Sequence, residues 1–237
     1  VGYRLPVIVS GTIEPMGTML AGQPADAFVA SLAHADLISI GLNCATGPEF
    51  MTDHLRTIHN MAQSGVHCYP NAGLPDEAGQ FCETPTSFAA ALERFVNNGW
   101  LNLVGGCCGT TPEHIRTIAQ MIEGKTPRYH KVPRKTYYSG LELVEAGADN
   151  RPLLVGERTN EVGSRKFKRL IQEERYEAAS EVARQQVRSG AQIIDINLEN
   201  PDRNEGEDID FFYVELVRKA IKTPFMIDTT DPVSVEK

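Results

Sequence analysis

Short apolar runs recur along this chain at a nearly constant interval, and this rhythm restricts the fold more than any other feature. In the first half the runs cover residues 5–10, 37–42, 65–69 and 101–104. They begin roughly every 30 to 35 residues, the interval of a strand followed by a helix in a parallel sheet. Each run is followed by glycine, asparagine, proline or cysteine, so a loop is expected after each strand.

Helical patterns occupy the intervals between these strands. Residues 51–64 place their apolar side chains on one face, and the next such stripe, in residues 88–96, stops at Gly99. Thr111 and Pro112 are suited to the N-cap and first position of a third helix, which Gly124 would end. Apolar strands separated by helices favour a barrel or a doubly wound sheet.

The rhythm stops at residues 125–151, a basic, proline-bearing and aperiodic stretch that we interpret as an interdomain linker. It restarts with predicted strands at residues 153–156, 193–197 and 225–228. The sequence therefore predicts two α/β domains with parallel strands, residues 1–124 and residues 152–237. Neither contains the eight strand–helix units that close a barrel.

Two helices are predicted in the second domain. One long helix ending near Gly190 carries its apolar positions at Leu170, Ile171, Ala178, Val182, Ala183 and Val187. A second helix, over residues 208–222, presents Phe211, Phe212, Val214, Leu216, Val217 and Ala220.

The overall composition limits the class of protein. The chain has 237 residues with 41% hydrophobic and 23% charged residues, as in globular proteins. Its net charge of −8 argues against nucleic acid as a partner. It has no apolar run of about 20 residues and no signal peptide, so we expect no membrane association and a cytoplasmic location. It also lacks an initiator methionine, so we expect a piece of a longer protein.

Three cysteines are predicted at the ends of strands in the first domain. Cys44 follows the second strand, and Cys107 and Cys108 follow the fourth within a Gly-Gly-Cys-Cys-Gly stretch. Because parallel strands end at the same edge of a sheet, the three thiols are expected to meet there. Three thiolates hold zinc and leave one coordination position open, which is typical of a catalytic site rather than a structural one.

Other interpretations of the cysteines remain open. They could be small buried apolar residues, or Cys107 and Cys108 could form a redox disulfide, which leaves Cys44 unexplained. Cys68 and Cys82 have no neighbours at metal-ligand spacing, so both are expected to be structural. His67 and Tyr69 should face away from Cys68 along an alternating strand. The remaining histidines are expected to be solvated: His34, His54, His59, His114 and His130.

The first domain resembles the homocysteine S-methyltransferase family. The resemblance rests on Gly41-Leu42-Asn43-Cys44, Tyr69-Pro70-Asn71-Ala72-Gly73 and Gly105-Gly106-Cys107-Cys108-Gly109-Thr110-Thr111-Pro112. It implies a (β/α)8 TIM-type barrel, of which residues 1–124 are the second half, with catalytic zinc held by Cys44, Cys107 and Cys108. It also implies that Asn71 can approach the zinc when homocysteine is absent.

The second domain resembles the pterin-binding methyltransferase family, whose members are also (β/α)8 barrels. The motifs are Gly156-Glu157-Arg158-Thr159-Asn160, Asp195-Ile196-Asn197 and Met226-Ile227-Asp228-Thr229-Thr230. Their order and spacing fit the first three strand–helix units. The two domains in this order resemble the N-terminal half of the cobalamin-dependent methionine synthase family, with each barrel only partly covered by this chain.

Polar residues at these strand ends are candidates for a pterin pocket. A pterin ring presents N–H donors beside an amide-like acceptor, which carboxylates and amides can match at the end of a barrel where active sites lie. Asp228 is the best candidate for a hydrogen bond to the ring, and Asn160, Asp195 and Asn197 are further pocket candidates. The alternative is that these residues only cap strand ends and the following helices.

The resemblance implies that 5-methyltetrahydrofolate donates its methyl group to cobalamin, and that methylcobalamin methylates the zinc-activated thiol of homocysteine. A cobalamin-binding domain of the same protein, outside this chain, would visit both barrels. One alternative is a cobalamin-independent homocysteine methyltransferase fused to a folate reductase barrel. A second is a zinc-binding module that does no chemistry.

Overall fold

A computed structural model describes residues 5–129, 131–132 and 135–235 of the chain. The chain divides into two compact units, Val1–Arg134 and Lys135–Lys237. Each unit is described by itself below.

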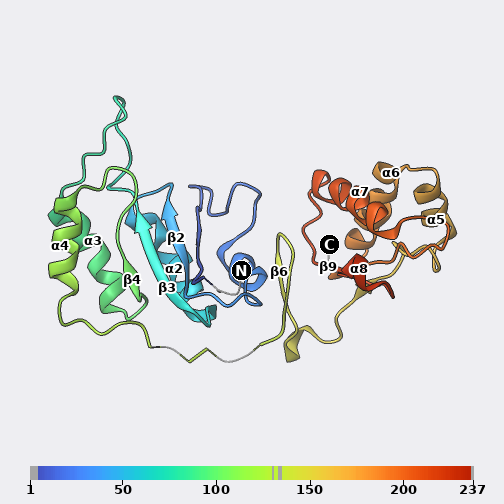
Figure 1. Ribbon diagram of the computed structural model, residues 1–237, viewed down its shortest axis with the longest axis horizontal. Helices are drawn as coiled ribbons and strands as arrows, with labels where there is room; N and C mark the ends of the chain where they lie inside the picture. The colour runs from blue at the N-terminus through green and yellow to red at the C-terminus, as the bar shows by residue number, and fades with distance from the viewer. Residues whose placement is uncertain (1–4, 130, 133–134, 236–237) are drawn as a thin grey trace. The chain divides into compact units, whose positions relative to one another are not determined.

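The first unit alternates strands with helices, as the rhythm predicts. Its elements are β1 (Ile8–Gly11), α1 (Ala25–Ser31), β2 (Ser39–Cys44), the 3-10 helix η1 (Pro48–Met51), α2 (Thr52–Met61), β3 (Gly65–Pro70), α3 (Pro85–Asn97), β4 (Leu103–Val104) and α4 (Pro112–Ile122). The strands pair in the order β1-β2-β3-β4, every pair parallel (Figure 1). All four strands therefore end at the same edge of the sheet.

The core of this unit lies between one face of the sheet and the four helices. Leu42 and Cys68 from the strands are fully buried against Leu55 of α2 and Phe88 of α3. The opposite face carries His67, whose ring stacks on that of Tyr69 at a centroid distance of 4.7 Å. The predicted alternation along β3 is confirmed, because Cys68 belongs to the core while its two neighbours face the other way.

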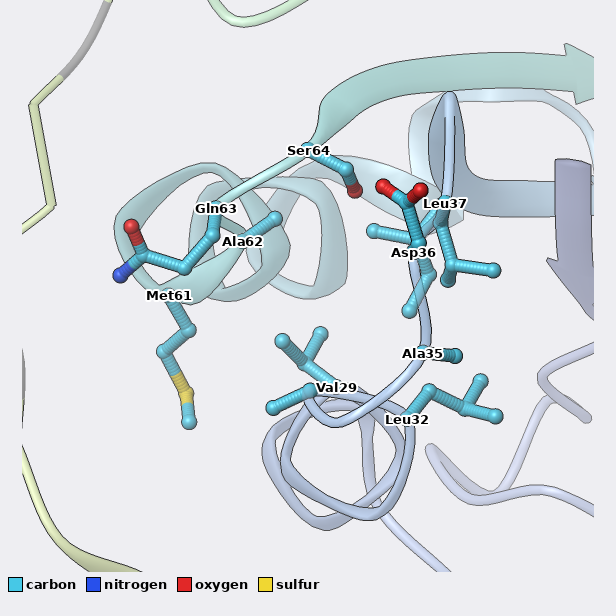
Figure 2. A pocket seen from close by; sticks show the side chains of 11 residues that line it. Val29, Leu32, Ala35, Asp36, Leu37, Met61, Ala62, Gln63 and Ser64 are labelled. Carbon is cyan, nitrogen blue, oxygen red and sulfur yellow. The ribbon is translucent and has the colours of Figure 1, made fainter. Parts of the chain in front are cut away.

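A pocket of about 170 Å³ opens between α1 and α2 (Figure 2). Val29 of α1 and Leu32, which follows that helix, face Met61 of α2 across it, and Leu37 and Ser64 precede β2 and β3. It therefore lies at the end of the sheet where the strands begin, opposite the end that carries the cysteines.

The segment predicted to be a linker, residues 125–151, contains ordered structure. Strands β5 (Tyr137–Ser139) and β6 (Leu143–Glu145) pair antiparallel, and the 3-10 helix η2 (Ala148–Asn150) follows them. Arg128 is buried, and its guanidinium donates to the carbonyl oxygens of His59, Ala62 and Ser64 at 2.7 to 3.1 Å. The aperiodic pattern did not predict this buried cation, because its partners are backbone atoms distant in sequence.

The second unit also alternates strands with helices. Its elements are β7 (Val155–Gly156), α5 (Arg165–Gln172), α6 (Tyr176–Arg188), β8 (Ile193–Ile196), α7 (Glu205–Arg218), β9 (Phe225–Ile227) and α8 (Pro232–Val235). The strands form a parallel sheet in the order β7-β8-β9. Its core joins β8 to the three longer helices through residues such as Ile194, Phe167, Ala183 and Phe212.

Two predictions about the helices of this unit are wrong in part. The single long helix is two helices, α5 and α6, separated at Glu174, whose backbone is in the left-handed region with φ of 54°. In α7, Phe212 and Leu216 are buried as predicted, whereas Phe211 and Val217 are more than half exposed. Only the face of α7 that meets α5 and α6 is covered.

Both units are therefore mixed α/β with parallel sheets, which agrees with the predicted class. Within the described part of the chain, no helix combines the length and the apolar composition needed to cross a membrane.

Candidate metal and pterin sites

The three predicted cysteines meet at the end of the first sheet. Cys44 is the last residue of β2, and Cys107 and Cys108 lie in the loop between β4 and α4. The Sγ atoms of Cys44 and Cys108 are 3.7 Å apart, and those of Cys107 and Cys108 are 3.9 Å apart. All three sulfur atoms lie within 4.8 Å of one another, and the described residues form no other such group of three metal-binding side chains.

The cysteine pair donates hydrogen bonds to the last residue of β3 and to the residue that follows it. The Cys107 N–H donates to the carbonyl oxygen of Pro70 at 2.8 Å. The Cys108 N–H donates to the side-chain oxygen of Asn71 at 3.1 Å. Asn71 therefore adjoins the site as predicted, and its amide is already used to orient Cys108.

Glycine at position 109 is required by two features of the loop. Its φ is +76°, a conformation that residues with a Cβ rarely adopt. A Cβ here would also lie 2.3 Å from the Cβ of Phe81. The close approach of residue 81 to the cysteine loop thus depends on a residue without a side chain.

The backbone at Cys44 is strained. Cys44 and Ala45 have φ of 59° and 46°, in the left-handed region that non-glycine residues seldom occupy. Such conformations cost roughly 1–3 kcal/mol per residue and concentrate at functional sites. The turn they form is closed by a 2.7 Å hydrogen bond from the Thr46 N–H to the Cys44 carbonyl oxygen.

The three thiols influence one another's ionisation. The backbone N–H of Ala45 lowers the pKa of the Cys44 thiol by donating a hydrogen bond to it. Hydrogen bonds to Cys44 and Cys107, together with their charges, raise the pKa of Cys108 to about 11. Three thiolates this close repel one another, so a cation is needed to keep all three ionised.

The donor set fits zinc. Zinc prefers thiolate ligands, and three of them leave a fourth tetrahedral position for another ligand. No disulfide joins the five cysteines in the structure, and the Sγ atoms of the vicinal pair are 3.9 Å apart.

A loop over residues 72–83 lies against the cysteine loop, and His114 fastens it. The Nε2 atom of His114 is 2.9 Å from the carbonyl oxygen of Glu83. The prediction that His114 is solvated is therefore wrong: its side chain is 5% exposed, and its ring meets Phe88 edge to face. Sequence reasoning missed it because Glu83 is distant along the chain.

The remaining cysteines and histidines lie apart from the sulfur triad. Cys68 is in the core, where burial raises the pKa of its thiol. Cys82 is exposed on the loop over residues 72–83. His34 is exposed as predicted, whereas His54 and His59 are half-buried. His130 lies outside the described residues.

The second unit brings the predicted pterin residues together at the end of its sheet. The Asn197 amide donates to a carboxylate oxygen of Asp228 at 3.2 Å, and Asn160 pairs with Asn197 in a parallel bridge. Asp228 is exposed, so its carboxylate is open to a ligand. Asn160 uses its side-chain oxygen to accept from the N–H groups of Val162 and Gly163 at 2.8 Å, which fixes the loop after β7.

Asp195, in strand β8, is more deeply buried than Asp228. It is 3% exposed, and burial, followed by the charge of Asp228, raises the pKa of its carboxyl group. A hydrogen bond with Asn160 acts in the opposite direction. Of the two carboxyl groups, Asp228 is the one exposed to a ligand.

Carboxylates that the sequence did not single out tie the neighbouring loops together. Glu161 accepts a 2.8 Å hydrogen bond from Asn200, and Glu205 accepts one of 2.7 Å from Thr229. These contacts join loops after β7, β8 and β9. No local pattern signals them, because each partner lies at least 24 residues away in the chain.

The fold and the sites define a class of protein, a parallel α/β protein with three thiols that could hold a metal ion and a second cluster of carboxylates and amides. Comparison with known families is more specific. Residues 2–122 match the model of the homocysteine S-methyltransferase family, and the chain belongs to that family. Residues 156–237 match the model of pterin binding enzymes. The protein is a methyltransferase, and the two matches support methyl transfer that involves homocysteine and a pterin or folate.

Proposed function

We propose that this chain contributes two half-reactions of a methionine synthase: activation of the homocysteine thiol on zinc, and binding of 5-methyltetrahydrofolate as methyl donor. The products would be methionine and tetrahydrofolate. Convergence of the Cys44, Cys107 and Cys108 sulfur atoms within 4.8 Å is the observation that carries the proposal.

For the first half-reaction the chain's own residues would hold the metal. Cys44 would supply one ligand from β2, and Cys107 and Cys108 would supply two from the loop after β4. Zinc bound there supplies Lewis acidity, which lowers the pKa of the substrate thiol at neutral pH. Asn71 and Pro70 accept hydrogen bonds from the N–H groups of the cysteine pair, which holds the two thiols in place.

In the second half-reaction the exposed carboxylate of Asp228 accepts hydrogen bonds from the pterin ring. Asn197 orients that carboxylate, and Asn160 and Asp195 complete the wall of the pocket. Hydrogen bonds to the pterin assist the departure of the methyl group by favouring a protonated tetrahydrofolate.

The finer architecture is part of the same proposal. We infer that residues 1–124 form the second half of one (β/α)8 barrel and that residues 152–237 form the first three strand–helix units of another, with residues 125–151 between them. Cobalamin, held by a domain outside this chain, would supply the methyl-carrier chemistry between the two sites. The parallel sheets and the order of the two family matches support this arrangement.

Zinc content and sulfur coordination of the purified protein, measured by X-ray absorption with and without homocysteine, test the proposal. We expect three sulfur ligands that become four when homocysteine is added. Four protein sulfur ligands with no response to homocysteine would favour a zinc-binding module without turnover, and an absence of metal would leave a redox role for the cysteine pair.

Methyl-donor dependence distinguishes the other alternative. A cobalamin-independent enzyme fused to a reductase barrel would transfer methyl without cobalamin and would oxidise a nicotinamide or flavin cofactor in the presence of methylenetetrahydrofolate. We expect neither activity, because carboxylates and amides at the strand ends suit pterin binding for methyl transfer.

A further inference from the structure

His114 contacts both loops that surround the sulfur triad, although it is not one of the ligands. Its Nδ1 atom accepts from the backbone N–H of Thr111 at 3.3 Å and lies 2.8 Å from the Thr111 hydroxyl. Its Nε2 atom is 2.9 Å from the carbonyl oxygen of Glu83. An amide N–H can only donate and a carbonyl can only accept, so the ring is neutral with its proton on Nε2.

From Glu83 a short path of hydrogen bonds leads to a metal ligand. The Glu83 N–H donates to the carbonyl oxygen of Ala72 at 3.4 Å, and the Ala72 N–H donates to the carbonyl oxygen of Cys108 at 2.9 Å. The Cys108 N–H in turn donates to Asn71. Both sides of the Cys108 peptide unit are thus held by the segment whose far end His114 fastens.

Burial makes the contact with Glu83 difficult to replace. His114 is 5% exposed and packs edge to face on Phe88, which is fully buried, so water has little access to the ring. Removing the donor would leave the Glu83 carbonyl without this partner in a largely dry environment. The loop would then be free to move away from the cysteine loop.

We propose that His114 is a positioning residue of the thiol site. Its Nδ1 atom caps α4, and its Nε2–H holds the loop over residues 72–83 in place, so that Cys108 keeps the orientation needed to bind a metal. The inference rests on the proposed function, because it concerns the residues that hold the metal. It assigns the two ring nitrogens separate tasks, which separate substitutions can test.

Two substitutions separate the roles of the ring nitrogens, because each one preserves the hydrogen bond made by only one of them. In His114→Asn the side-chain oxygen takes the place of Nδ1 and can still accept from Thr111, but nothing reaches Glu83. In His114→Gln the amide nitrogen takes the place of Nε2 and can still donate to Glu83, but the cap on α4 is lost. His54→Gln on α2 is a matched control for the loss of a half-buried imidazole in the same unit.

Affinity for Zn²⁺ is measured by competition with a chromophoric chelator on the full chain, and thermal unfolding is followed in parallel. We expect His114→Asn to lower the affinity about 10- to 100-fold, the usual effect of losing a residue that orients a metal ligand. His114→Gln and His54→Gln should stay within about threefold of the wild type, even if His114→Gln is the less heat-stable of the His114 variants.

Two results would overturn the inference. One is wild-type affinity in His114→Asn. The other is an equal loss of affinity in both His114 variants in proportion to their loss of thermal stability, because a purely structural role predicts that. A wild-type chain that binds no Zn²⁺ would instead reject the proposed function, and the positioning role with it.

Discussion

The three cysteines of the proposed zinc site differ in how the backbone holds them. Cys44 is in a left-handed turn, whereas Cys107 and Cys108 are held by hydrogen bonds to the end of β3 and the residues that follow it. A serine in place of any of them keeps the shape but offers a poor zinc ligand. Substitutions to serine therefore test ligation with little effect on packing.

We predict that Cys107→Ser and Cys108→Ser abolish zinc binding and leave folate binding unchanged, since the pterin residues belong to the other compact unit. Metal analysis and folate titration of the same preparations measure the two effects. Cys82→Ser is the control, because Cys82 is exposed and outside the triad. Loss of both zinc binding and folate binding in the same variant would indicate misfolding and contradict the assignment of these cysteines to zinc binding alone.

Asp228→Asn should weaken folate binding without changing zinc content. A hydrogen bond to a charged acceptor is worth roughly 1.5–3 kcal/mol, so the dissociation constant should rise about 10- to 100-fold. Asp202→Asn, on the neighbouring loop after β8, should bind folate as the wild type does. Equal affinities for the Asp228 and wild-type proteins would remove Asp228 from the pterin site.

The sequence predicted the sulfur triad because only one physical rule was needed: parallel strands end at the same edge. It could not predict the contacts of His114, Glu161 or Glu205, which depend on how loops fold over one another. The Thr111–His114 pair has the spacing of a helix cap, and that was the one local signal available.

Helices α5 and α6 show how an apolar stripe can cross a break in the backbone. Leu170 and Ile171 lie before the break and Ala179 and Ala183 after it, yet all four belong to one core. Periodicity reports which side chains are buried and does not register a single left-handed residue between them. The prediction of one long helix failed for this reason, although its buried face was largely correct.

Glu174→Gly should stabilise the second unit. A residue with a Cβ pays roughly 1–2 kcal/mol in the left-handed region, and glycine avoids most of that cost while gaining entropy when unfolded. We expect a net gain of about 1 kcal/mol in the free energy of unfolding, measured with urea. Glu173→Gly, at φ of −85°, should instead destabilise the unit. A loss of stability in Glu174→Gly would contradict this account of the break.

At the scale of the whole chain, the two units have separate cores, and the proposed zinc and folate sites lie in different units. A ligand that binds only the folded state adds about 2.7 kcal/mol of stability at a concentration of 100 times its dissociation constant. We therefore predict that zinc raises the melting temperature of one calorimetric transition and that folate raises the other. A single transition that moves with both ligands would contradict independent units.

Histidines give the units different responses to acid, because every histidine of the chain precedes residue 135. Burial lowers the pKa of His67 from 6.5 to about 4. Between these values the unfolded chain binds the proton and the folded chain does not, so stability must fall as the pH falls, by up to about 1.4 kcal/mol per pH unit. Below about pH 4 both states are protonated, and the slope from this residue ends.

We predict that His67→Gln flattens the pH dependence of stability in the first unit between pH 6.5 and 4. Urea unfolding of that unit at several pH values measures the slope, with His34→Gln as an exposed control. An unchanged slope in His67→Gln would show that the buried imidazole is not responsible.

The burial of Arg128 has a mechanical consequence. Its guanidinium holds the carbonyl oxygens at the end of α2, and its own N–H is bonded to the Leu101 carbonyl oxygen ahead of β4. A force that pulls on the chain after Arg128 would therefore have to break several hydrogen bonds at once. These bonds would resist such a force before it reached β4, the strand that leads to Cys107 and Cys108.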